Sequence, residues 1–239
     1  MKNPQSRFNL FLVIFIVGAV SGLTLTVLST WADLEAAYYG FARRAGAGLG
    51  GLSCPVLMTA DETNAITLNV TNPTDRKLSP AIRTEISSPA MAFLYSDYVE
   101  LQPGDSTLME WEIGPGNVDL KHFIFAKVLV YASYPIPDQE GTCGVYIVNL
   151  PGNGAVITWA MVLLSLLGMG YGLYGMKQAQ SQMGSGMDVA RQLMFLAIVV
   201  LLGLVTVFMG WWIQGILLLV VALLFSVIYS GLIVNRHKS

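Results

Sequence analysis

Charge and cysteine are both scarce in this sequence. Only 12% of its 239 residues are Asp, Glu, Lys or Arg, whereas about 25% is usual in soluble domains, and 54% are hydrophobic. The apolar residues stand in blocks rather than at helix or strand spacing, which indicates lipid as the surrounding solvent. The sequence has no basic stripe, so we expect no binding to nucleic acid.

The sequence also lacks the motifs that usually carry enzyme chemistry. Its two histidines, His122 and His237, have no further ligands at the spacing of a metal site. No nucleophile elbow, phosphate-binding loop or pair of catalytic carboxylates is evident. The glycines within residues 168–175 lie in an apolar run, whereas a dinucleotide fingerprint would follow a strand. We predict no catalytic, cofactor-binding or metal-binding residues, and a protein that is not an enzyme.

Long apolar runs dominate what is present. A helix needs about 20 apolar residues to cross a hydrocarbon core of about 30 Å, and residues 8–28 and 155–176 each reach this length. The run 192–234 would form a helix of roughly 64 Å, enough for two crossings. We divide it at residues 210–215, where two glycines flank interface-seeking tryptophans. The sequence therefore predicts four transmembrane α-helices, the first of them a retained anchor rather than a removed signal peptide.

Charged residues orient these helices. Fourteen of the fifteen acidic residues lie between Asp33 and Glu140. Basic residues beside short loops stay in the cytoplasm, and those near the helix ends are Lys2, Arg7, Lys177, Arg191 and Arg236. We therefore predict a plasma or inner membrane location, with both termini cytoplasmic and residues 30–152 extracytoplasmic.

The predicted segments follow from these boundaries. They are the cytoplasmic N-terminus and first transmembrane helix (1–29), a juxtamembrane helix and glycine-rich linker (30–52), an extracytoplasmic β-sandwich (53–152), the second transmembrane helix (153–176), a cytoplasmic loop (177–191), the third transmembrane helix (192–210), and the fourth transmembrane helix with a cytoplasmic tail (211–239). In the juxtamembrane segment we expect a helix over residues 31–44, with Thr30 as its N-cap and Arg43 and Arg44 at its end. These arginines either end a solvated helix or contact lipid phosphates.

Cys54 and Cys143 are the only cysteines, and they bracket the extramembrane stretch. In an oxidising compartment a bridge between them would close a loop of about 90 residues and contribute roughly 4 kcal/mol. We predict a disulfide rather than a catalytic or metal-binding pair, because no other residue completes such a site.

Short runs of alternating apolar and polar residues fill the region between the cysteines, and Pro, Gly, Asn and Asp separate them. This pattern predicts an all-β antiparallel sandwich with about seven strands over residues 54–150. The clearest apolar faces are Ile66, Leu68 and Val70 on one strand and Met109, Trp111 and Ile113 on another.

Three stretches, NVTNP at 69–73, SP at 88–89 and LQPGDS at 101–106, resemble bacterial immunoglobulin-like or fibronectin type III-like modules. The resemblance covers about 100 residues and is carried by turn and strand residues, so it implies a fold and a display role but no chemistry. The cysteines depart from the antibody pattern because they lie near the ends of the domain.

Residues 122–131 form an unusual strand because both of its faces are apolar. A solvated face would carry polar residues, so something should cover the outward face. The chain's own linker or the membrane surface is one candidate cover, and a partner subunit is the other. The candidate partner contacts are Phe123, Phe125, Leu129 and Tyr131 on this strand, together with Phe93, Tyr95 and Tyr98 from an aromatic segment.

Glycines at a spacing of three or four recur in the first two apolar runs, where small residues let helices approach closely. We expect Gly18, Gly22, Gly168, Gly172 and Gly175 to line helix contacts, either with each other or with a neighbouring subunit.

These features together predict a non-catalytic accessory or scaffolding subunit of a prokaryotic envelope membrane complex. Its partners would be other subunits of the complex or a second copy of the chain, with the lipid bilayer around its helices. Two alternatives stay open. One is a homo-oligomeric transporter or channel component, although the central parts of the spans hold no ionisable residue. The other is a membrane-anchored adhesion or ligand-sensing module.

Overall fold

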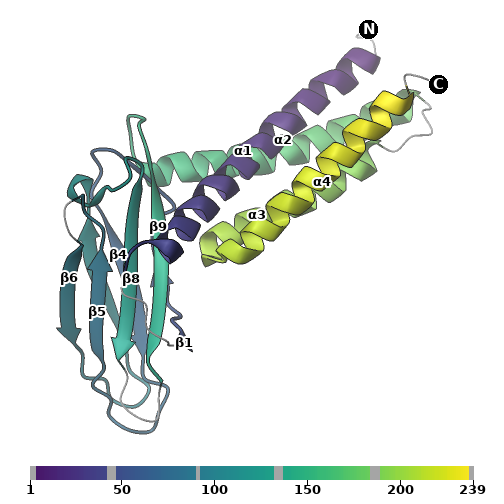
Figure 1. The fold of residues 1–239 in the computed structure, drawn as a ribbon. Coiled ribbons are helices and arrows are strands. Elements are labelled where there is room, and N and C mark those ends of the chain that lie inside the picture. The colour runs from purple at the N-terminus through teal and green to yellow at the C-terminus, as the bar shows by residue number, and fades with distance from the viewer. Residues whose placement is uncertain (1–3, 42–46, 90–91, 132–136, 184–188, 237–239) are drawn as a thin grey trace. The chain divides into compact units, whose positions relative to one another are not determined.

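The computed structural model describes residues 4–41, 47–89, 92–131, 137–183 and 189–236. They fold as two compact units, which we call the helical unit (residues 1–30 and 158–239) and the β unit (Trp31–Ile157). Helix α1 (Pro4–Tyr38) and helix α2 (Gly154–Met183) each contribute residues to both units (Figure 1).

The helical unit also contains α3 (Val189–Met209) and α4 (Trp212–Arg236). Among the described residues, three helices are long and apolar enough to cross a membrane by length and composition, over Pro4–Tyr38, Gly154–Ser181 and Ala190–Met209. The apolar stretch of α4 among the residues whose side chains are described is shorter, Trp212–Val227. Four transmembrane helices therefore stay a prediction.

The turn between α3 and α4 lies at Gly210, inside the segment 210–215 at which the sequence divides the long apolar run. Gly210 has a φ of +64°, which a glycine adopts without steric cost. The amide of Trp211 donates to the carbonyl oxygen of Thr206 over 3.1 Å. A left-handed glycine with this backward bond is the Schellman ending, which satisfies the last carbonyl groups of α3.

The β unit holds nine strands among its described residues: β1 (Ala47–Gly48), β2 (Leu52–Ser53), β3 (Leu57–Thr59), β4 (Asn64–Thr71), β5 (Ala81–Ile86), β6 (Phe93–Tyr98), β7 (Ser106–Ile113), β8 (Phe123–Tyr131) and β9 (Gln139–Val148). One sheet has the order β1-β9-β8-β5-β6, and β3 also pairs with β9. The other sheet has the order β2-β4-β7.

One apolar core joins the two sheets. Ile66 and Leu68 of β4 and Trp111 of β7 enter it from the smaller sheet, and Ile124 and Val128 of β8 enter it from the larger one. The alternation of apolar and polar residues explains this arrangement, because successive side chains of a strand point to opposite faces. The indole N–H of Trp111 donates to Asp97 of β6 over 3.1 Å, so the one polar atom of this ring is also satisfied.

One detail of the predicted sandwich needs correction. The larger sheet is mixed rather than antiparallel, because β1 and β3 both run parallel to β9, with Leu57 opposite Tyr146. The Cys54–Cys143 disulfide, which the sequence predicts, ties the segment before β3 to β9. Seven strands, β3 to β9, lie in the described part of residues 54–150. The immunoglobulin-like class stays a prediction.

The predicted juxtamembrane helix does not exist as a separate element. Helix α1 runs without a break from Pro4 to Tyr38, so Thr30 lies inside it rather than at an N-cap. No Gly or Pro lies between Gly22 and the helix end, and nothing in this stretch therefore interrupts the backbone bonding. The expected end at Arg43 and Arg44 lies outside the described residues.

Candidate interaction surfaces

Strand β8 is buried from Phe123 to Val130. Its inward side chains belong to the core between the sheets. On its outward face, Phe123 and Phe125 pack with Ala32, Ala36 and Phe41, which come from the last turns of α1 and the residues after it. The chain's own helix end thus covers this part of the strand.

The prediction that Phe123, Phe125 and Leu129 contact a partner needs correction, because all three are buried within this chain. Tyr131, at the end of the strand, is half-buried. The sequence indicates correctly that the outward face is covered, but it does not identify the cover.

Gly144 of β9 lies directly against the backbone of α1. A Cβ atom at Gly144 would lie 2.0 Å from the carbonyl oxygen of Ala32 and 2.2 Å from its carbonyl carbon. Both atoms belong to the backbone and cannot rotate away. Glycine is therefore the residue that lets the helix end lie flat against β9.

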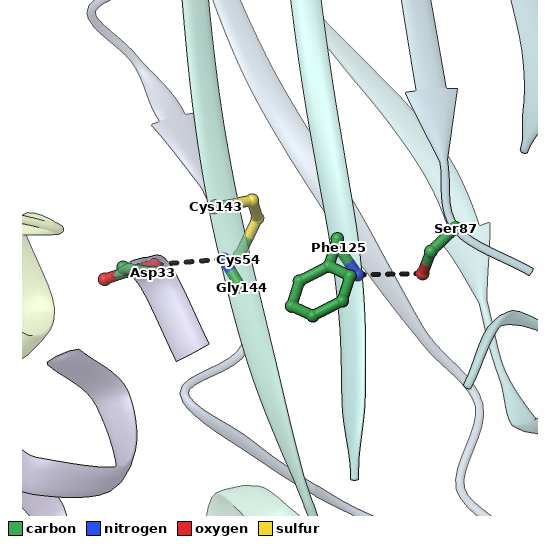
Figure 2. The surroundings of a disulfide bond; sticks show 6 residues. All are labelled: Asp33, Cys54, Ser87, Phe125, Cys143 and Gly144. Carbon is green, nitrogen blue, oxygen red and sulfur yellow. Dashed lines mark hydrogen bonds between the residues drawn. A yellow bond between two sulfur atoms is a disulfide. The ribbon is translucent and has the colours of Figure 1, made fainter. Parts of the chain in front are cut away.

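Asp33 reinforces this contact. On the edge away from β8, strand β9 pairs with β1 at Gln139 and Glu140 and with β3 from Tyr146 to Val148. Among the described strands, none pairs with Gly144 on this edge. The carboxylate of Asp33 accepts a hydrogen bond from the amide of Gly144 over 3.0 Å (Figure 2). A buried sheet amide therefore finds its acceptor on a helix.

The environment of Asp33 is unusual for a carboxyl group. The residue is only 8% exposed. It lies beyond the apolar run 8–28, and therefore outside the proposed membrane-spanning segment. Burial raises the pKa of Asp33 from 3.8 to about 6, and the hydrogen bond from Gly144 opposes part of this rise. Desolvation disfavours the charged form of a carboxyl group more than one amide stabilises it here.

Aromatic rings complete the docked helix end. The ring of Trp31 meets that of Phe123 edge-on at 5.3 Å between centroids, and the ring of Tyr39 lies 4.6 Å from that of Phe125. The hydroxyl of Tyr39 donates to the carboxylate of Asp119. On the other side of β8, the hydroxyl of Ser87 accepts from the amide of Phe125 over 2.9 Å (Figure 2). Neighbouring elements therefore hold Phe125 from both sides.

Charged side chains continue the outward face of the larger sheet beyond these rings. Lys127 of β8 lies 3.1 Å from Glu140 of β9, and Arg83 lies 2.9 Å from Glu85 on β5. Each pair places opposite charges together, which offsets the cost of their partial burial.

Strand β6 presents a different surface. Among the described strands it pairs only with β5, so it forms one edge of the larger sheet. We call the side chains of Phe93, Leu94, Tyr95 and Tyr98 the β6 edge, and they are between 39% and 83% exposed. Three of the predicted partner contacts, Phe93, Tyr95 and Tyr98, therefore lie together on one exposed strand.

The glycines of the helical unit lie at helix contacts. A Cβ at Gly18 would lie 2.7 Å from the backbone nitrogen of Met169, and one at Gly168 would lie 2.9 Å from the Cα of Gly18. A Cβ at Gly172 would also clash with Phe15, and a Cβ at Gly175 would clash with the ring of Phe11.

Gly22 faces a different pair of neighbours, since its Cβ would lie 2.4 Å from the hydroxyl of Ser165 and 2.6 Å from Val200 of α3. The structure thus brings α1 and α2 together within this chain, and α3 also approaches α1 at a glycine.

The sequence analysis did not identify two residues of these surfaces, Asp33 and Gly144. Asp33 has the identity expected of a solvated helix residue, and Gly144 stands among many glycines. Their positions next to an apolar run and a cysteine are the only signals of a special role. In the part of the chain that the structure describes, no three His, Cys, Asp or Glu side chains gather as metal ligands would.

No protein-family model and no curated protein matches the sequence. Among solved structures, Bacteroides uniformis β-glucuronidase 2 bound to cyclophellitol-6-carboxylate aziridine aligns with 41% of this chain at 13% identity and a TM-score of 0.33. A β-glucosidase from Erythrobacter marinus aligns with 46% of it at 17% identity and a TM-score of 0.30. The chain spans only 13% and 18% of these enzymes, and likeness this weak supports no conclusion about fold or activity.

Proposed function

We propose that this protein is a membrane-anchored accessory or scaffolding subunit of a prokaryotic envelope complex, which binds another subunit through its β6 edge. The proposal places the apolar run 8–28 of α1, together with α2, α3 and α4, across the plasma or inner membrane and the β unit outside the cytoplasm. The apolar helices support the membrane location, and the disulfide supports an oxidising compartment.

The exposed β6 edge is the observation that carries the proposal. An unpaired sheet edge offers a row of backbone donors and acceptors to another chain, and most proteins protect such edges with Lys, Pro or a bulge. Strand β6 has the sequence FLYSDY, and its only charge, Asp97, accepts a hydrogen bond from Trp111. The exposed side chains of the strand are Phe93, Leu94, Tyr95, Ser96 and Tyr98, and three of these five are aromatic, a class enriched in protein interfaces.

Isolation of the full chain in mild detergent, followed by native mass measurement, tests this function. We expect the chain to be recovered with a partner subunit or with a second copy. Replacing Tyr98, the most exposed of the four β6-edge side chains, by Lys should reduce the amount of partner recovered, because the charge would be desolvated in the interface.

Leu108→Lys provides a matched control, because Leu108 is also a large exposed side chain and lies on β7 of the other sheet. It should leave the recovered complex unchanged. A wild-type chain that is monodisperse and monomeric under these conditions would contradict the proposed function, as would equal effects of the two variants.

A further inference from the structure

The turn Asp119–Phe123, which leads into β8, has a strained backbone. Leu120 has a φ of +46° and Lys121 a φ of +71°, and among the described residues they are the only non-glycine residues with positive φ. The turn is closed by two backbone bonds between Asp119 and Phe123, of 2.7 and 3.1 Å. Residues with a Cβ are disfavoured in this left-handed region, where Gly or Asn is usual.

Both side chains of this turn are exposed. Leu120 is 57% exposed, and Lys121 is also exposed. The sequence uses 24 glycines elsewhere, including the positive-φ positions Gly51 and Gly104. Backbone strain of this kind persists where the side chains serve a function.

The turn lies at the end of the β unit from which α2 begins. The carbonyl oxygen of His122 accepts from the amide of Ile147 over 2.8 Å, near the end of β9. The ring of His122 stacks on that of Tyr146 at 6.1 Å, and Tyr146 also faces Trp31 at 6.2 Å. Trp and Tyr concentrate at the boundary between membrane and water. An aromatic group of this kind therefore adjoins the turn.

The first residue of α2 is fixed at this same end. The amide of Gly154 donates to the carboxylate of Glu62 over 2.7 Å, and the hydroxyl of Thr59 donates to the carbonyl of Gly152 over 3.0 Å. A Cβ at Gly154 would lie 2.2 Å from the carbonyl oxygen of Leu57, so the start of α2 rests directly on β3. The apolar run of α2 begins at the next residue.

A bilayer that surrounds α2 must therefore have its surface close to this end of the β unit. Leu150, in the connection from β9 to α2, is exposed there as well. We propose that the turn Asp119–Phe123 inserts into the interfacial layer of the bilayer, with Leu120 among the upper acyl chains and Lys121 at the lipid phosphates.

Amphipathic segments bind bilayers in this way, with apolar side chains below the headgroups and a lysine ammonium reaching back to them. The inference rests on the proposed function, because it requires that α2 cross the membrane. It adds a lipid-binding element in the β unit, on the strand-to-strand turn rather than on the helices.

Depth measurements on the full chain in phosphatidylcholine–phosphatidylglycerol nanodiscs test the inference. The native cysteines form a disulfide, so a single new cysteine can carry an NBD fluorophore without reduction of the protein. Four variants suffice: Leu120→Cys and Leu150→Cys at the proposed membrane surface, Leu167→Cys on the exposed side of α2, and Leu108→Cys on β7. Lipids with a nitroxide at a shallow or a deep acyl position then quench each site according to its depth.

We expect the probes at Leu120 and Leu150 to emit at shorter wavelength than the probe at Leu108, and to be quenched by the shallow nitroxide. The probe at Leu167 should respond to the deep nitroxide. If the probes at Leu167 and Leu120 both behave like that at Leu108, the proposed membrane crossing of α2 fails. If Leu167 lies in lipid while Leu120 and Leu150 behave like Leu108, the crossing stands and the inserted turn is refuted.

Discussion

The replacement Asp33→Asn tests whether the end of α1 is docked on β9 as described. Asparagine has the shape of aspartate and keeps an oxygen that can accept from the amide of Gly144, whereas it cannot ionise. Because burial raises the pKa of Asp33 from 3.8 to about 6, the folded protein binds this proton more tightly than the unfolded chain does. The variant therefore isolates the free energy of burying the charge.

The sign and size of the effect follow from linkage. Below the unfolded pKa the carboxyl is neutral in both states, and its ionisation costs nothing. As the pH rises towards 6, only the unfolded chain loses the proton, so the folded state of the wild type becomes progressively less stable. The penalty is complete above pH 6 and amounts to about 3 kcal/mol, from a shift of about two pKa units at 1.36 kcal/mol each. In a unit of this size the difference corresponds to about 10 °C in Tm.

Thermal unfolding of the full chain in detergent, followed by near-ultraviolet circular dichroism, measures the difference. We expect Asp33→Asn to raise the Tm of the β unit at roughly pH 7.5 and to have little effect at roughly pH 4. Asp75→Asn serves as the control, because the Asp75 carboxylate is almost fully exposed and its replacement should leave the Tm unchanged. An equal effect of Asp33→Asn at both pH values would refute the docking of Asp33.

Three further substitutions test other contacts. Gly144→Ala should destabilise the β unit by about 2–4 kcal/mol, since the added Cβ meets the backbone of Ala32, whereas Gly116→Ala, in open space, should be nearly neutral by thermal unfolding. Gly168→Val should lower the Tm of the helices in detergent by overpacking worth about 1–3 kcal/mol, and Gly170→Val, which meets nothing, should not; equal shifts would contradict the contact with α1. Lys121→Gly should stabilise the detergent-solubilised chain by about 1 kcal/mol in chemical unfolding, because glycine relieves the positive φ, and a loss of stability would show that the turn is not strained.

Features that depend on local periodicity were accessible without the structure. The alternation around Ile66 and Trp111 identified two strands and their buried faces, because side chains of a strand alternate whatever the strand packs against. The cysteines identified their own bridge, since the chain offers no other pairing. The glycine spacing of α1 and α2 indicated close contacts, although it could not tell a contact within the chain from one between subunits.

Features that depend on distant segments were not accessible. Residues 31–41 are as compatible with a separate surface helix as with the docked end of α1, because propensity does not report what a helix packs on. The strands that pair with β9 are distant from it in the sequence, and no local pattern shows whether they run parallel or antiparallel to it. The sequence therefore did not predict that β1 and β3 each run parallel to β9. The exposed aromatic segment of β6 was found, but its place at a sheet edge follows from the order of all the strands.

The sequence by itself determined the apolar helices, the strand faces and the covalent bridge, because each is set by side-chain chemistry at a fixed spacing along the chain. Only the tertiary structure decided that the end of α1 covers Phe123 and Phe125, whereas the aromatic side chains of the β6 edge stay exposed. The reason is that Gly144, more than a hundred residues after Ala32, has no side chain to hold that helix away from the sheet.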